Sequence, residues 1–135
     1  MFESADLIHR YTRADALRDG VLIDVSATAW EAGFKCPVAL TAAAWVKCVA
    51  VPSAVQCQDE AGRLWDVLTM LRLAARGQTD GARGVRSDGA REVRFGVHVR
   101  NDNRERTPPL VRLKALCGPG DQGEAIITVM LPEEG

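Results

Sequence analysis

The sequence predicts an α+β fold in a single domain, with short N-terminal helices and a strand, then a long central helix packed on a C-terminal antiparallel β-meander. Residues 92–131 hold three segments in which apolar and polar residues alternate, EVRFGVHVR, LVRLKALC and EAIITVML. A period of two with one apolar side is typical of half-buried antiparallel strands. Before them, residues 59–77 carry apolar side chains at helical spacing. Helices followed by a run of strands favour the α+β class.

The chain has 135 residues, which is most simply one domain covering 1–135. A chain of this size buries enough surface to form a core without metals or disulfides. Its 47% apolar residues and net charge of −1 are typical of a globular protein in water. No apolar run approaches the roughly 18 residues that span a bilayer, and MFESADLIHRYTR lacks the apolar stretch of a secretory signal. We therefore expect a cytoplasmic protein with no membrane partner.

The first predicted elements are a short helix and a strand. Thr12 followed by Asp15 matches a capping box, and Gly20 is placed to end that helix in a left-handed conformation. Residues 21–26, VLIDVS, then predict an apolar strand that is interrupted only by Asp24.

Two further short helices follow. Ser26 is the expected cap of a helix through residue 32, with Trp30 as its packing anchor. FKCPV reads as a connector, because a proline favours an extended residue before it. Thr41 is then placed to cap a helix over 42–49 whose buried face carries Trp45, Cys48 and Val49.

The long helix is predicted over 59–77. Asp59 is the expected N-terminal cap and Gly77 the C-terminal stop. Apolar residues at helical spacing form its expected core stripe, namely Leu64, Leu68, Leu71 and Ala75. The remaining polar residues form its expected solvent side, namely Arg63, Asp66, Thr69, Arg72 and Arg76.

An internal repeat separates this helix from the meander. TDGARGVR at 79–86 is followed directly by SDGAREVR at 87–94. Each copy contains an Asp-Gly turn signal. We expect a flexible loop at 77–91; a small hairpin or an arginine-rich recognition loop is the alternative.

The sequence disfavours most kinds of catalytic and metal-binding site. The four cysteines are widely spaced without a CxxC pair, and there are only two histidines, so we expect reduced thiols and no metal site. No P-loop, dinucleotide or nucleophile-elbow motif is present. We therefore predict no catalytic residues and no cofactor.

A basic surface is the best candidate site. Residues 72–114 carry eleven Lys or Arg against five acids. The polar sides of the first two meander strands are expected to share one exposed sheet face, formed by Arg94, His98, Arg100, Arg112 and Lys114. Gly96 is expected to leave a gap there for a ligand or backbone. Such a face suits an acidic protein surface or nucleic-acid phosphates, although it lacks aromatic residues for base stacking.

Three long stretches resemble an uncharacterised family of small bacterial proteins encoded on plasmids, phages and other mobile elements. They are LIHRYTRADALRDGVLIDVS, CQDEAGRLWDVL and VRNDNRERTPPLVRLKALCGPGD. The resemblance implies an accessory role for a mobile element in a bacterial cytoplasm. It supplies no activity and no site residues.

Three functional hypotheses follow. The first is a non-enzymatic accessory protein that binds its partner through the basic sheet face. The second is a small enzyme with a site near Asp24, Ser26 and the polar side of the long helix. The third is a structural module that forms a homodimer through an open sheet edge.

Overall fold

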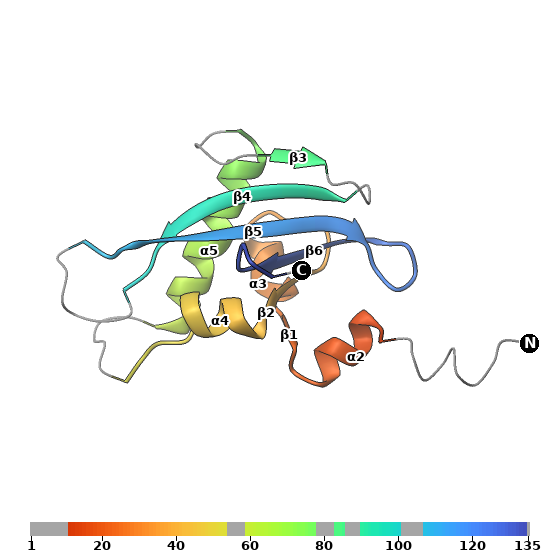
Figure 1. Cartoon of the computed structure of the whole chain (residues 1–135), viewed down its shortest axis with the longest axis horizontal. Helices are drawn as coiled ribbons and strands as arrows, with labels where there is room; N and C mark the ends of the chain where they lie inside the picture. Colours follow the sequence, from red (N-terminus) through yellow and green to blue (C-terminus); the bar gives the residue numbers. More distant parts are fainter. Residues whose placement is uncertain (1–10, 54–58, 78–82, 86–89, 101–106, 135) are drawn as a thin grey trace, which may run out of the picture.

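The computed structural model describes residues 11–53, 59–77, 83–85, 90–100 and 107–134. It confirms the predicted α+β class, with the long helix α5 between short N-terminal elements and the terminal strands (Figure 1). The elements in chain order are α2 (Arg13–Arg18), β1 (Leu22–Asp24), α3 (Ser26–Glu31), β2 (Val38–Thr41), α4 (Ala42–Cys48), α5 (Glu60–Ala75), β3 (Arg83–Val85), β4 (Arg91–His98), β5 (Leu110–Pro119) and β6 (Ala125–Met130).

The strands form one six-stranded sheet in the order β1-β2-β6-β5-β4-β3. The predicted meander is present, since β4, β5 and β6 pair antiparallel in sequence order. β2 pairs with β6 in parallel, and β1 pairs with β2 antiparallel. The N-terminal half is therefore part of the same sheet as the meander.

β2 is the strand that the sequence pattern did not predict. Its residues Val38, Ala39 and Leu40 are all buried, so they show no alternation that would separate a strand from a connector. The carbonyl of Pro37 accepts a hydrogen bond from the amide of Ile127 at 2.9 Å, so pairing with β6 begins at the proline itself.

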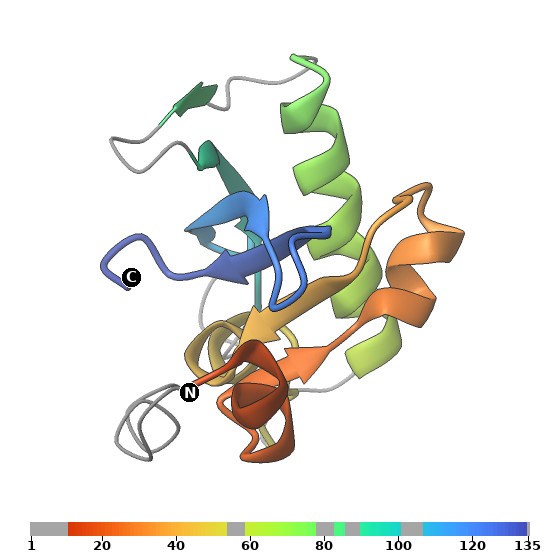
Figure 2. The ribbon, with the colours of Figure 1, turned by 90° about the vertical axis from the view of Figure 1, so that its right-hand side faces the viewer.

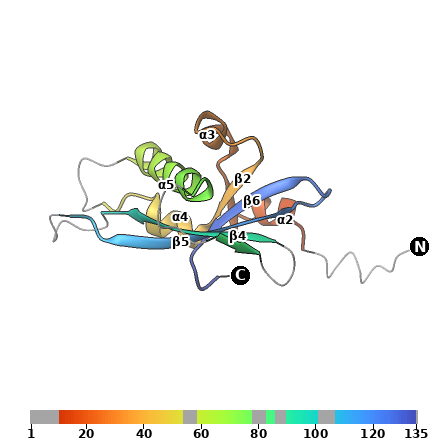
Figure 3. The same ribbon diagram turned by 90° about the horizontal axis from the view of Figure 1, so that it is seen from above.

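α5 lies across the strands and covers one face of the sheet, the inner face; the opposite face is the outer face (Figures 1 and 3). The predicted alternation in β4 is confirmed, because Phe95 and Val97 are buried within the core, as is Val99 just past the end of the strand. The residues of α5 that pack into the same core are Leu64, Val67, Leu68, Leu71 and Ala74. Ala74 takes the place expected for Ala75, which is exposed.

The predicted N-terminal caps of α2, α4 and α5 are confirmed, whereas Ser26 does not cap α3. Thr12 and Asp15 form the capping box of α2. The side chains of Thr41 and Asp59 accept from backbone amides in the first turns of α4 and α5. Each cap satisfies an amide that the helix itself leaves without a partner. Gly20 ends α2 with φ at 78°, a conformation that suits glycine.

Trp30 does not anchor α3, contrary to expectation. Its side chain is 65% exposed, and Ala29 and Ala32 are the residues of this segment that pack into the core. A Cβ placed on Gly33, just after α3, would lie 2.9 Å from Nε of Arg72, so the Arg72 side chain occupies the space beside this end of α3. The ammonium of Lys35 instead lies 4.9 Å from the centre of the Trp30 ring.

The segment predicted as a flexible loop, 77–91, contains a short strand. β3 pairs antiparallel with β4, with Gly84 opposite Glu92. This pairing matches the hairpin alternative for the repeat. Residues 78–82 and 86–89 lie outside the described residues.

Candidate docking surface

The candidate docking surface is the outer face of β4 and β5. The register places Arg94 opposite Lys114, Gly96 opposite Arg112, and His98 opposite Leu110. Side chains alternate between the two faces of a strand, and the neighbours Phe95 and Val97 point inward, so these three pairs point outward. The structure thus brings four of the five predicted binding residues onto one face.

These four residues differ in their solvent exposure. Arg94, His98 and Arg112 are exposed, as predicted. Lys114 is only 6% exposed, so the expectation of an exposed lysine is wrong. Strand alternation identifies the face on which a residue lies, but not what covers that face. The exposed outer residues of β4 and β5, namely Arg94, His98, Leu110 and Arg112, are called the open strip from here on.

Arg100 lies two residues past the end of β4 and is half-buried, so it does not belong to the open strip. The sequence placed it on the exposed face by continuing the alternation of the strand. The backbone pairing with β5 extends as far as the bond from the amide of Val99 to the carbonyl of Pro109, so strand alternation does not fix the side on which Arg100 lies.

The gap expected above Gly96 is filled. A Cβ on Gly96 would lie 2.8 Å from Cδ1 of Leu110, so the leucine side chain occupies the space over the glycine. Leu110 is nevertheless 47% exposed. The open strip therefore has an apolar centre between its basic residues.

Arg94 of the open strip forms an ion pair with Glu92. Nε of Arg94 is 2.8 Å from a carboxylate oxygen of Glu92, and the two side chains are 51% and 20% exposed. An exposed pair of this kind contributes at most about 1 kcal/mol. Arg112 makes no ion pair within the described part of the chain, so its charge remains available at the surface.

A backbone contact holds His98 in place. Its Nδ1 lies 2.8 Å from the carbonyl oxygen of Pro108. A carbonyl only accepts hydrogen bonds, so Nδ1 is the donor in this contact. This contact ties the open strip to the residues just before β5.

Contacts from α2 cover part of the other half of the outer face. Arg13 of α2 donates to the hydroxyl of Thr128 at 2.6 Å and to the carbonyl of Ile127 at 3.2 Å. The carboxylate of Asp121 accepts from the backbone amides of Arg13 and Ala14. These amide bonds lower the pKa of Asp121, because they stabilise its charged form. They hold α2 against β6.

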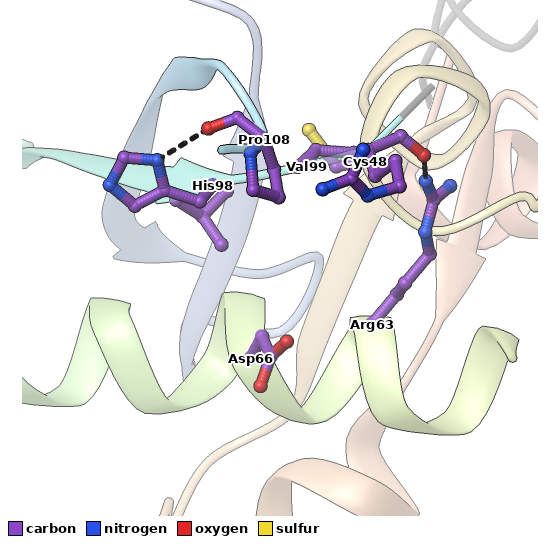
Figure 4. A pocket seen from close by; sticks show the side chains of 8 residues that line it. Cys48, Arg63, Asp66, His98, Val99 and Pro108 are labelled. Carbon is purple, nitrogen blue, oxygen red and sulfur yellow. Dashed lines mark hydrogen bonds between the residues drawn. The ribbon is translucent and has the colours of Figure 1, made fainter. Parts of the chain in front are cut away.

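A cavity of about 260 Å³ lies between the first half of α5 and the end of β4 (Figure 4). Two of the predicted binding residues border it. Its wall is formed by Cys48, Arg63, Asp66, Val97, His98, Val99, Arg100 and Pro108.

Arg63 is a buried residue of this wall, although the sequence placed it on the solvent side of α5. It is 4% exposed and donates to the carbonyl of Ala50 at 2.5 Å and to the carbonyl of Arg100. Burial lowers the pKa of its guanidinium, because the charged form loses hydration. One signal was available in the sequence: Arg63 shares the helical row of Val67 and Leu71.

Cys48 is fully buried in the same wall. Burial raises the pKa of its thiol to about 11, although the nearby charges of Lys47 and Arg63 act in the opposite sense. At neutral pH the thiol therefore stays protonated, which is the unreactive form. Among the described residues, no three His, Cys, Asp or Glu side chains are grouped to hold a metal ion.

Local hydrogen bonds join the residues of the polar cluster proposed for the enzyme hypothesis. The carboxylate of Asp24 accepts from the amide and the hydroxyl of Ser26 at 3.0 and 2.6 Å. The hydroxyl of Ser26 accepts from the amide of Val38 at 3.1 Å. Ser26 is the first residue of α3 rather than its cap, which is Val25. The cluster thus joins β1, α3 and β2.

Comparison with known proteins identifies a family. Residues 1–135, the whole chain, match the family described as "Family of unknown function (DUF6573)". The chain belongs to this family. The resemblance predicted from the sequence is thereby confirmed at the level of an unknown-function family. Neither a curated protein nor a solved structure matches this DUF6573 chain. Among its described helices, none is long and apolar enough to cross a membrane.

Proposed function

We propose that this DUF6573 protein is a non-enzymatic binding protein that docks an acidic protein surface through the open strip. The observation that carries the proposal is the arrangement around Leu110: an exposed leucine between exposed basic side chains on an uncovered sheet face. Apolar contact at the centre and complementary charge at the rim are the usual parts of a protein interface.

Nucleic acid fits the open strip less well. The outward positions of β4 are Glu92, Arg94, Gly96 and His98, and those of β5 are Leu110, Arg112, Lys114 and Leu116. None is Phe, Tyr or Trp, the residues on which bases stack. Two exposed arginines, one of them paired with Glu92, also form few phosphate contacts.

The two alternatives receive less support. The edges of the sheet are β1 and β3, each three residues long, and short edge strands limit edge-to-edge pairing. For an enzyme, the cluster at Asp24 is exposed and engaged in local bonds, and Cys48 is a protonated buried thiol.

The cellular setting is a separate part of the proposal. We propose that the protein acts in the cytoplasm of a bacterium as an accessory protein of a plasmid, phage or other mobile element. Its support is the resemblance of the three long sequence stretches alone. Detection of the protein in fractionated cells that carry such an element would test this setting.

Charge reversal tests the docking surface. The variant combines Arg94→Glu with Arg112→Glu, and its control combines Lys35→Glu with Arg76→Glu, which are exposed elsewhere and give the same change in net charge. The probes are a leucine-containing acidic peptide and a 20-nucleotide single-stranded DNA at 0.15 M salt.

We expect the strip variant to bind the peptide at least tenfold more weakly than the unaltered protein, and the control to differ by less than twofold. Equal loss in both variants would show a general charge effect and overturn the strip assignment. Tighter binding of the DNA than of the peptide would replace the acidic protein by nucleic acid as partner.

A further inference from the structure

One cross-strand row runs through the outer face from its covered half to the open strip. The register places Thr41 beside Met130 by extension of the β2–β6 pairing, Met130 opposite Lys114, and Lys114 opposite Arg94. Neighbouring strands lie about 4.8 Å apart, so Thr41 and Lys114 are separated by roughly 10 Å. The row thus connects β2 directly with the docking surface.

Burial along this row changes abruptly. Arg94 has a side chain that is 51% exposed, whereas Lys114 is 6% and Met130 7% exposed. All three point to the outer face, away from α5. A buried lysine beside an exposed arginine on one sheet face means that something covers the row from Lys114 onward.

The residues after β6 lie on this side of the sheet. Figures 2 and 3 show the chain leaving β6 and turning back on the face opposite α5. The turn at 131–134 is closed by a bond from the amide of Glu134 to the carbonyl of Leu131. The carboxylate of Glu134 accepts from the hydroxyl of Thr41 at 2.7 Å and from the amide of Leu131 at 2.8 Å. An acidic segment is thereby held at the end of the row that contains Lys114.

We propose that the 131–134 turn covers the row next to the open strip, and that an acidic segment of the partner takes its place. This inference rests on the proposed function and identifies the partner's chemistry: a short segment with a carboxylate that replaces Glu134 at Thr41. Displacement uncovers the ammonium of Lys114 and the apolar side chain of Met130. The docking surface then extends from β4 and β5 onto β6.

The hydrogen bonds that keep the 131–134 turn in place are suited to such an exchange. The carboxylate of Glu134 has one hydrogen bond to the sheet and one within its own turn. A carboxylate from a partner reproduces the first bond, so little is lost when one replaces the other. The partner also gains a contact with Lys114. A binding site made only of exposed, solvated strand residues would not offer this contact.

Lysine labelling tests the cover without any partner. The chain has three lysines, and Lys35 and Lys47 are exposed, so they serve as internal references for Lys114. Acetylation at pH 8 is followed by mass spectrometry in the unaltered protein, in Glu134→Ala and in Glu133→Ala, a neighbouring exposed glutamate. We expect Lys114 to react at least tenfold more slowly than Lys35 in the unaltered protein. Its rate should rise at least fivefold in Glu134→Ala and stay within twofold in Glu133→Ala.

An unchanged Lys114 rate in Glu134→Ala would overturn the proposed cover. Glu134→Gln provides the same comparison if the alanine variant loses its fold by circular dichroism, because it removes the charge and keeps the shape. The acidic peptide should bind Glu134→Ala three- to tenfold more tightly than Glu133→Ala, and equal affinities would overturn the exchange. If the acidic peptide does not bind the open strip, the proposed function is wrong. The labelling rate of Lys114 would still show whether the 131–134 turn covers it.

Discussion

The guanidinium of Arg63, in the first half of α5, donates to the main-chain carbonyl of Arg100, just beyond the end of β4. The same side chain donates to the carbonyl of Ala50 after α4. One buried side chain therefore connects the helix layer, the α4 segment and the end of the strand that carries the open strip. The charged donor thus serves two main-chain carbonyls in part-buried positions.

Replacing Arg63 should therefore destabilise the fold strongly. Arg63→Met keeps the apolar stem and removes the donors, so we expect a loss of about 2–4 kcal/mol in the free energy of unfolding. Urea denaturation monitored by circular dichroism measures this. Arg76→Met, exposed at the end of the same helix, should change stability by less than about 0.5 kcal/mol. Equal effects in the two variants would contradict the role of Arg63.

The thiol of Cys48 should make stability depend on alkaline pH. Its folded pKa is about 11, raised from an ordinary value of 9.0 by burial. A raised pKa stabilises the folded state fully below pH 9, and this stabilisation is lost as the pH rises to 11. The loss is of the order of 2–3 kcal/mol.

Cys48→Ala isolates this contribution. The unfolding free energies of the unaltered protein and the variant, measured between pH 8 and 11, should converge by that amount as the pH rises. A difference that stays constant over this range would contradict the assigned pKa.

The cap of α5 should contribute a modest and specific amount. The carboxylate of Asp59 accepts from the amide of Gly62 at 2.5 Å. Asp59→Ala removes this acceptor and should cost about 1 kcal/mol, whereas Asp59→Asn keeps a side-chain oxygen and should cost little. Thermal melts of the two variants provide the comparison; an asparagine variant as unstable as the alanine variant would argue against capping.

Trp30 should be dispensable for the fold. The ring is 65% exposed and contacts the ammonium of Lys35, an interaction worth about 0.5–1 kcal/mol at an exposed site. Trp30→Ala should therefore cost less than about 1 kcal/mol. Ala29→Trp, which places an indole at a fully buried position of the same helix, should prevent normal folding. A large loss from Trp30→Ala in denaturant unfolding would restore the anchor role expected from the sequence.

Local signals in the sequence determined most of the elements, although not the buried strand β2. Capping side chains such as Thr12 and Asp59 bind amides only three residues away, so their role depends on neighbours in the chain. The alternation of β4 likewise reports which side is buried, because side chains on a strand point to opposite faces in turn. Fold class, long helix and meander therefore followed from local pattern.

Only the tertiary structure decided which outward residues are open to solvent. Arg94 and Lys114 are cross-strand partners on one face, and the sequence treats them alike. One is exposed and the other is buried, and strand alternation carries no information about that difference. Arg63 is also buried, and it donates to carbonyls from two other parts of the chain. Contacts between distant segments have no local signature, so the sequence identified the basic face and the fold determined its extent.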